Sequence, residues 1–312
     1  MDRYLAQPVH GVRSGHGESP VYDDRTDELL WVDAFVGEIN VARVEHSDGW
    51  KFTRHTAYKI GEEVGAVVPA ADPDDGWMVD AGYGFGRLSR DGRYTILCEP
   101  ERGVDPPTRM NDGKCDPSGH FWAGSIGVEM EPGAARLHRL DPDGRCTEML
   151  TGVTVSNGMA WQGADTAYYI DSLTNRVDVL RVADDGSILR RETAFSIDPA
   201  LGVPDGMSVD AAGRLWVALW GGSAVGCFTP EGELVAKVEV AATHVSSCAF
   251  GGPALSTLFV TTVRPTWLSE EDAAAEPSSG FVFAVDLPTP GLAVDRFGQA
   301  RLDVEYPWSE SL

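Results

Sequence analysis

Leu215-Trp216-Val217-Ala218 is one of six short apolar segments that recur along the 312 residues of the chain. The other five are Leu30-Trp31-Val32-Asp33, Trp77-Met78-Val79-Asp80, Phe121-Trp122-Ala123-Gly124, Tyr168-Tyr169-Ile170-Asp171 and Leu258-Phe259-Val260-Thr261. Their second residues are 47, 44, 47, 47 and 43 positions apart. A period of this length, with several strands in each unit, is typical of a β-propeller. The spacing therefore predicts six blades.

The segments between these repeats are rich in hairpin signals. Asp and Asn tolerate left-handed backbone and Gly adopts it freely, so Asp-Gly pairs close hairpins. The pairs are Asp75-Gly76, Asp91-Gly92, Asp112-Gly113, Asp143-Gly144 and Asp185-Gly186, with Glu231-Gly232 as a variant. No sustained helical period interrupts them. We predict an all-β chain, residues 1–312 forming a single six-bladed β-propeller domain of about four strands per blade.

Both ends of the chain extend well beyond the repeats. Thirty residues precede Trp31, and 53 follow Phe259. A propeller whose last blade is completed by a strand from the N-terminus has no open edge. We therefore expect the two termini to close the ring together.

Four polar residues precede four of the repeats at nearly the same distance. Glu18, Asn111, Asn157 and Asp205 lie 13, 11, 12 and 11 residues before the second residue of the following segment. In equivalent blades they would occupy equivalent places and converge on the propeller axis. Two carboxylates and two amides supply hard oxygen ligands, which predicts a divalent-metal site in the central channel. Ca²⁺ fits such ligands best, with Mg²⁺, Mn²⁺ and Zn²⁺ as alternatives.

A purely structural role for these polar residues is the alternative, in which they satisfy backbone groups in a buried channel. Two carboxylates that point at one axis would repel each other, and a buried carboxylate without a cation or partner is unfavourable. These considerations favour metal binding. The remaining two repeats have Gly65-Ala66 and Ser246-Ser247 at the corresponding place, so those blades should leave room beside the metal.

The composition excludes several classes of protein. A formal net charge of −23 argues against nucleic acid as a partner, because the phosphate backbone would be repelled. The chain has no run of 18 apolar residues, which argues against a membrane span. Five cysteines without close pairing fit a reducing compartment, and the first residues lack a signal-peptide pattern, so we expect a cytoplasmic protein.

Four motifs give the chain a recognisable family resemblance. They are Gly17-Glu18-Ser19-Pro20, Arg109-Met110-Asn111-Asp112-Gly113-Lys114-Cys115-Asp116-Pro117, Ser156-Asn157-Gly158-Met159-Ala160 and Pro204-Asp205-Gly206-Met207. Taken together and in this order they resemble the gluconolactonase family, which includes regucalcin. The resemblance implies a six-bladed propeller, in agreement with the repeat count.

The resemblance also implies roles for individual residues. Glu18, Asn157 and Asp205 would hold the metal, and Arg109 and Asn111 would contact substrate hydroxyls or the outer shell of the metal. A family glutamate falls on Glu129, in a loop that is shorter here than in vertebrate members. Glu131 is the alternative for that position.

An open site of oxygen ligands can polarise a carbonyl group, so it suits attack of water on a cyclic ester. We expect a hydrolase that opens a sugar (aldono-) lactone, with Asp205 as ligand and general base. A purely ligating Asp205 and an ordinary salt bridge for Arg109 are the simpler alternatives for these two residues. The other possible functions are a metal-dependent phosphotriesterase-like hydrolase and a non-catalytic scaffold whose metal stiffens the axis.

Overall fold

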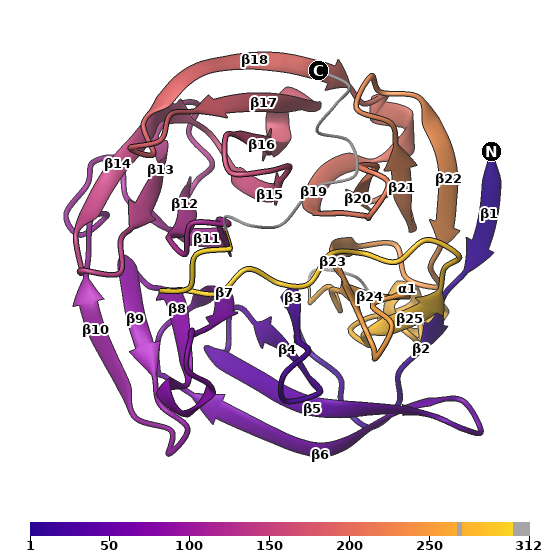
Figure 1. Ribbon diagram of the computed structural model, residues 1–312. Coiled ribbons are helices and arrows are strands. Elements are labelled where there is room, and N and C mark those ends of the chain that lie inside the picture. Colours follow the sequence, from indigo (N-terminus) through magenta and orange to yellow (C-terminus); the bar gives the residue numbers. More distant parts are fainter. Residues whose placement is uncertain (267–269, 302–312) are drawn as a thin grey trace.

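Six sheets stand around a central axis like the blades of a propeller (Figure 1). The computed structural model describes residues 1–266 and 270–301 of the chain. Five sheets have four strands, and the fifth blade has an additional strand at its outer edge. The structure confirms the all-β fold and the six blades predicted from the period.

Each blade runs outward from the axis in chain order, except at the edges that the N-terminus supplies. Blade one consists of β3 (Gly17–Asp23), β4 (Glu28–Asp33), β5 (Glu38–His46) and β6 (Trp50–Lys59). Blade two consists of β7 (Val64–Pro69), β8 (Trp77–Ala81), β9 (Gly84–Leu88) and β10 (Tyr94–Cys98). Blade three consists of β11 (Thr108–Cys115), β12 (Phe121–Gly127), β13 (Ala135–Leu140) and β14 (Cys146–Val153). Blade four consists of β15 (Ser156–Trp161), β16 (Thr166–Asp171), β17 (Arg176–Val182) and β18 (Ile188–Ser196). Blade five consists of β19 (Val203–Val209), β20 (Leu215–Trp220), β21 (Ala224–Phe228), β22 (Leu234–Glu239) and β1 (Asp2–Leu5). Blade six consists of β23 (Val245–Gly251), β24 (Thr257–Thr262), β25 (Phe283–Asp286) and β2 (Gln7–Pro8).

Helical structure is confined to short elements between strands. These are three 3-10 turns, η1 (Pro73–Asp75), η2 (Ser172–Thr174) and η3 (Pro199–Leu201), and one α-helix, α1 (Glu270–Ala275), among the described residues. None of the helices in that part of the chain has the length and apolar character needed to cross a membrane.

The N-terminal segment closes the ring. β2 pairs with β25 and forms the outermost strand of blade six, as expected from the residues that precede the first repeat. β1 pairs in parallel with β22 at the edge of blade five. N-terminal residues thus supply the outermost strand of both blade five and blade six.

The C-terminal residues 287–301, here called the strap, cross the ring near its centre (Figure 1). Backbone hydrogen bonds join the strap to blades six, five, two and three, and an ion pair between Arg296 and Asp24 joins it to blade one. The backbone bonds are Gly291 N to Leu255 O, Ala211 N to Pro290 O, Phe297 N to Pro69 O, and Gly298 N to Gly119 O. The strap therefore contacts blades that are not neighbours in the ring.

The six repeated segments form the second strand of each blade and fill the space between blades. Trp31, Trp77, Trp122, Tyr169 and Phe259 are 0–1% exposed, and Trp216 is 2% exposed. The indole nitrogens of Trp122 and Trp216 donate to Asp116 and Asp210 in the preceding hairpins. Burial of the aromatic faces stabilises the stack of blades, and these hydrogen bonds satisfy the buried donors.

Every innermost strand contains a β-bulge at the same height. The register against the second strand shifts between Glu18 and Val21, Val64 and Ala66, Met110 and Gly113, Ser156 and Met159, Pro204 and Met207, and Val245 and Ser247. A bulge bends the strand and re-aims its side chains. The prediction of a hairpin at Asp112-Gly113 was wrong, because this pair lies within β11 at its bulge.

Blades two and six place small residues at the bulge, as expected from the sequence. Ser246 donates its hydroxyl hydrogen to the carbonyl oxygen of Gly17, 2.6 Å away, and so ties blade six to blade one. At Gly65 an added Cβ would fall against the backbone carbonyl of Asn111 and the carboxylate of Asp80. Close approach between blades two and three therefore requires glycine at this position.

We expect Gly65→Ala to destabilise the protein by about 1–3 kcal/mol, the usual effect of overpacking a close contact. Urea unfolding monitored by tryptophan fluorescence measures this change. Gly15→Ala is a suitable control, because its Cβ would lie at an ordinary 3.5 Å from Asp33 Oδ1. Equal stability of the two variants would contradict the close approach at Gly65.

Candidate active site

One end of the central channel opens into a cavity of about 930 Å³. Five of the residues singled out by the sequence line this cavity: Glu18, Arg109, Asn111, Asn157 and Asp205. Four of these residues come from the bulges of β3, β11, β15 and β19, so the equivalent positions of four blades do converge. The repeat spacing thus predicted correctly which side chains lie together.

The two amide side chains are oriented by their own hydrogen bonds. Asn157 Nδ2 donates to Ser172 Oγ at 2.9 Å, and Asn111 Nδ2 donates to the backbone oxygen of Ser156 at 2.8 Å. Among the described residues, the oxygen of Asn111 accepts only a long hydrogen bond of 3.4 Å from Arg109 Nη1. Asn111 Nδ2 also lies 3.4 Å from Asn157 Oδ1, which places the two amides side by side.

The two carboxylates, Glu18 and Asp205, are buried, and both have raised pKa values. Burial is the largest cause of the raised pKa of both Glu18 and Asp205; for Glu18 the pKa rises to about 8. The negative charge of Glu18 raises the pKa of Asp205 further. Asp205 is 7% exposed, and its Oδ1 atom has no hydrogen-bond partner among the described residues.

A third acid belongs to this cluster and was not predicted from the sequence. Asp112 follows Asn111 in the bulge of β11, and it accepts a hydrogen bond of 2.8 Å from the hydroxyl of Ser19. Burial raises its pKa, while Lys114 and Ser19 lower it. The charge of Asp112 in turn raises the pKa of both Glu18 and Asp205. Its position next to Asn111 was the available signal, but the Asp-Gly pair was interpreted as a turn.

Arg109 lies at the wall of the cavity in a fixed orientation. Its Nε is 3.1 Å from Glu63 Oε2, its Nη1 donates to the backbone oxygen of Met110 at 2.9 Å, and its guanidinium carbon is 5.3 Å from the ring centre of Phe35. The salt bridge considered from the sequence is present. It holds the guanidinium beside the cavity, where burial lowers the pKa of the group and Glu63 opposes that shift.

His16 forms part of the same wall. Its ring lies 4.5 Å from that of Phe35, and its Nε2 is 4.0 Å from Glu18 Oε1. Burial, with additional repulsion from Arg109, lowers the pKa of His16 to about 4. The imidazole is therefore neutral near pH 7 and contributes no positive charge to the acids.

The structure places Glu129 outside the cavity. Its side chain is exposed, whereas Val128 and Met130 on either side of it line the cavity. Glu131 is not among the lining residues, and its carboxylate accepts a hydrogen bond from the backbone nitrogen of Glu129 at 3.3 Å. Neither of the two glutamates therefore faces the acids of the channel in this structure.

The donors present fit one hard cation. Glu18 and Asp205 supply carboxylate oxygens, Asn111 and Asn157 supply amide oxygens, and the partnerless Asp205 Oδ1 is a buried acceptor in need of a positive partner. No group of three or more His, Cys, Asp or Glu side chains suited to a metal occurs in residues 1–266 and 270–301. A metal site here would therefore include the amides, and a donor set made of carboxylate and amide oxygens favours an oxygen-seeking ion.

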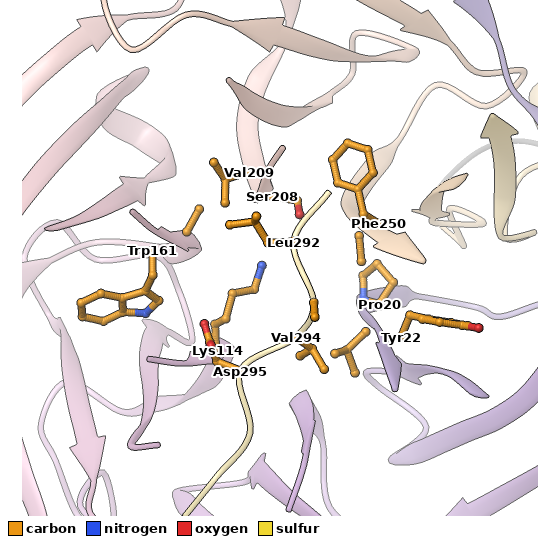
Figure 2. A pocket seen from close by; sticks show the side chains of 14 residues that line it. Pro20, Tyr22, Lys114, Trp161, Ser208, Val209, Phe250, Leu292, Val294 and Asp295 are labelled. Carbon is orange, nitrogen blue, oxygen red and sulfur yellow. The ribbon is translucent and has the colours of Figure 1, made fainter. Parts of the chain in front are cut away.

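The opposite end of the channel is covered by the strap. Further along the inner strands, Lys114 extends among Trp161 and the strap residues Leu292, Val294 and Asp295 (Figure 2). Lys114 Nζ donates to the backbone oxygen of Met207 at 2.8 Å. Burial lowers the pKa of Lys114, while Asp112 and Asp295 oppose that change. Lys114 thus lies between the strap and the acids, and it lowers the pKa of Asp112.

The fold and the cavity define a class: six-bladed propellers with an oxygen-donor site at one end of the channel. Residues 16–264 match the family model described as the SMP-30/Gluconolactonase/LRE-like region, and the chain belongs to this family. Regucalcin of Danio rerio is 33% identical over 276 residues, which cover 86% of this chain and 90% of the relative. Pentonolactonase XacC of Haloferax volcanii is 32% identical over 283 residues, which cover 88% and 92%.

Similarity to a solved structure extends to the whole ring. The calcium-binding protein regucalcin of Agrobacterium tumefaciens str. C58 superimposes with a TM-score of 0.86 at 24% identity, covering 96% of this chain and 99% of that one. At this identity the match establishes the fold. It agrees with the number of blades and with the closure of the ring.

The raised pKa of Glu18 predicts how stability depends on pH when metal is removed. A carboxyl whose folded pKa exceeds its unfolded pKa binds its proton more tightly in the folded protein. Its contribution is complete below the ordinary value of 4.5 and is lost as the pH rises to about 8. With a chelator present, we expect stability to fall across this window, by up to about 1.4 kcal/mol per pH unit for each proton.

The variant Glu18→Gln should flatten this slope, whereas Glu231→Gln, a change at an exposed turn, should leave it unchanged. His16 contributes an opposite slope as the pH falls from 6.5 to about 4, and the difference between the two variants removes that contribution. Denaturant unfolding at several pH values measures the effect. The same slope in both variants would show that Glu18 is ionised normally.

Proposed function

We propose that this chain hydrolyses a lactone, and that Glu18, Asn157 and Asp205 hold one divalent cation with Asn111 beside them. The observation that carries the proposal is the pair of acids, Glu18 and Asp205, that are buried together with raised pKa values while Asp205 Oδ1 lacks a partner. A cation between them would offset both burial and mutual repulsion. Ca²⁺ suits the oxygen donors best, with Mg²⁺, Mn²⁺ and Zn²⁺ as alternatives.

When bound, a divalent cation in this place supplies a Lewis acid that polarises the ester carbonyl. Proton transfer falls to Asp205. Water bonds to the carbonyl carbon as one carboxylate oxygen of Asp205 takes its proton, and the ring carbon–oxygen bond then breaks. The same proton passes to the released ring oxygen, so the product is the open hydroxy acid.

Arg109 and Asn111 orient the substrate in this proposal. Contacts with Glu63, Met110 and Phe35 fix the guanidinium of Arg109 at the wall of the cavity. The N–H groups that these contacts do not use therefore have a fixed orientation. A rigid guanidinium suits the carbonyl or hydroxyl oxygens of a lactone. Glu129 would contact substrate only if its loop turned inward, since its side chain is exposed.

The family assignment supports the reaction class. A relative that shares about a third of its residues with this chain is named as a pentonolactonase, and the family model carries gluconolactonase in its description. A lactone-hydrolysing enzyme with a small-molecule substrate is consistent with both. A panel of aldonolactones and organophosphate triesters, each tested with and without chelator, separates the lactonase from a phosphotriesterase-like enzyme and from a non-catalytic scaffold.

We expect Glu18→Gln to weaken divalent-metal binding, because the change removes a formal charge and preserves the shape of the side chain. Isothermal titration with Ca²⁺ measures the affinity directly. Glu231→Gln again serves as the control for a lost charge far from the channel. Wild-type affinity in Glu18→Gln would remove Glu18 from the proposed ligands.

We expect Asp205→Asn to lower kcat for an aldonolactone by about 10²–10⁴-fold even at saturating metal, the usual effect of losing a general base. The amide retains an oxygen ligand but cannot take the proton from water. A purely ligating Asp205 would instead give a variant that excess metal rescues. Near-normal turnover at saturating metal would therefore exclude Asp205 as the base.

A further inference from the structure

Exposed apolar side chains gather at the mouth of the cavity. The lining includes Phe35, Tyr83, Val128, Met130 and Leu173, which are 51%, 40%, 56%, 53% and 52% exposed. These five residues, here called the apolar ring, are nearly half of the eleven large apolar side chains that are exposed in the described parts of the chain. Contiguous exposed apolar surface of this kind marks a binding site more often than scattered apolar residues do.

The apolar ring follows the repeat of the fold. Phe35, Tyr83 and Leu173 each lie two positions beyond the end of the second strand of their blade, after β4, β8 and β16. Val128 and Met130 lie one and three positions beyond the end of β12, in blade three. Four successive blades therefore each contribute an apolar side chain from the corresponding loop to the cavity that the polar residues of the channel also line.

Hydrogen-bonded turns hold these side chains in place. The Met130 nitrogen donates to the Gly127 oxygen at 2.8 Å, and the Val128 nitrogen donates to the Pro107 oxygen at 3.0 Å. Met130 adopts a φ of 55°, an unfavourable backbone conformation for a residue with this side chain. Such strain persists where the surroundings impose it, and here it directs an apolar side chain into the cavity.

Several polar groups that line the cavity are already engaged with protein partners. Two of the lining hydroxyls already have partners, because Ser172 accepts a hydrogen bond from Asn157 and Thr108 donates to Glu101. Glu63 is paired with Arg109. Each sugar hydroxyl that loses water without gaining a partner weakens binding, whereas an apolar group gains from contact with the ring.

The cavity is also large for a single sugar ring. Its volume of about 930 Å³ lies near the upper end of the range for drug-sized ligands, roughly 300–1,000 Å³. A monocyclic lactone bound at the acids would leave the mouth unfilled. The shape therefore accommodates a substrate with a compact polar end and a larger apolar end.

We propose that this site selects lactones whose ring carries an alkyl or aryl substituent, with the ester at the acids and the substituent against the apolar ring. This inference rests on the proposed lactonase function and names its substrate class. The acidic side chains of Glu62 and Glu63 line the same mouth. Because Glu63 is paired with Arg109, it is the charge of Glu62 that favours a neutral lactone over an anionic ligand and repels the carboxylate product as it leaves.

The test compares γ-lactones of increasing alkyl chain length with an aldonolactone, using the full chain at saturating divalent metal. We expect kcat/KM to rise by roughly fourfold for each methylene that reaches the apolar ring. We expect Met130→Asn, which keeps a residue tolerant of positive φ, and Leu173→Ser each to lower kcat/KM for the long-chain lactones by about tenfold. The unsubstituted γ-lactone, assayed with the same variants, separates a loss confined to the long chains from a general loss of activity. Leu189→Ser, a change at a 70% exposed leucine in β18, is the matched control.

A binding measurement keeps the inference separate from the reaction. The probe is a γ-lactam that carries the same alkyl chains, titrated calorimetrically into wild type and variants. Tighter binding with longer chains, lost in Met130→Asn, supports the substrate class even if hydrolysis is not observed. Hydrolysis of aldonolactones without any gain from alkyl chains overturns this inference and leaves the lactonase proposal intact. The absence of turnover for both series would refute the lactonase proposal, and the lactam titration would then decide whether the ring binds apolar ligands.

Discussion

Repulsion between buried acids at one point on the axis is the constraint on which the site depends. Glu18, Asp112 and Asp205 come from three different blades, and the charge of Asp112 raises the pKa of the other two. These side chains cannot move apart, because each lies at a bulge in an innermost strand that is packed against its neighbours. The nearby hydroxyl of Ser19 and the cation of Lys114 offset part of the repulsion at Asp112. For the pair formed by Glu18 and Asp205, the proposed cation would supply a further positive charge.

The period of the repeats made the architecture and the main site predictable. Segments that share a spacing share a place in the blade, so a polar residue at a fixed distance before Trp31, Trp122, Tyr169 or Trp216 had to lie on an inner strand. The residues before the first repeat likewise indicated that an N-terminal strand would complete blade six. These inferences need only equivalence between units, which the sequence displays directly.

Side-chain direction at the bulges and in the loops could not be predicted in the same way. Asp112-Gly113 has the composition of a turn, and only the register shift in β11 shows that its acid belongs to the channel. In the loop after β12, the left-handed backbone of Met130 decides which side chains face the cavity and leaves Glu129 exposed. Both outcomes depend on backbone angles that residue type alone does not determine.

The strap changes how the ring can come apart. In most repeat proteins each unit touches only its neighbours, so one unit can open while distant units stay folded. Here a single segment bonds to Leu255, Ala211, Pro69 and Gly119, which belong to four different blades. Loosening any of these blades strains contacts across the diameter of the ring. Because the strap is bonded to several blades at once, we expect the blades to unfold together and not one after another.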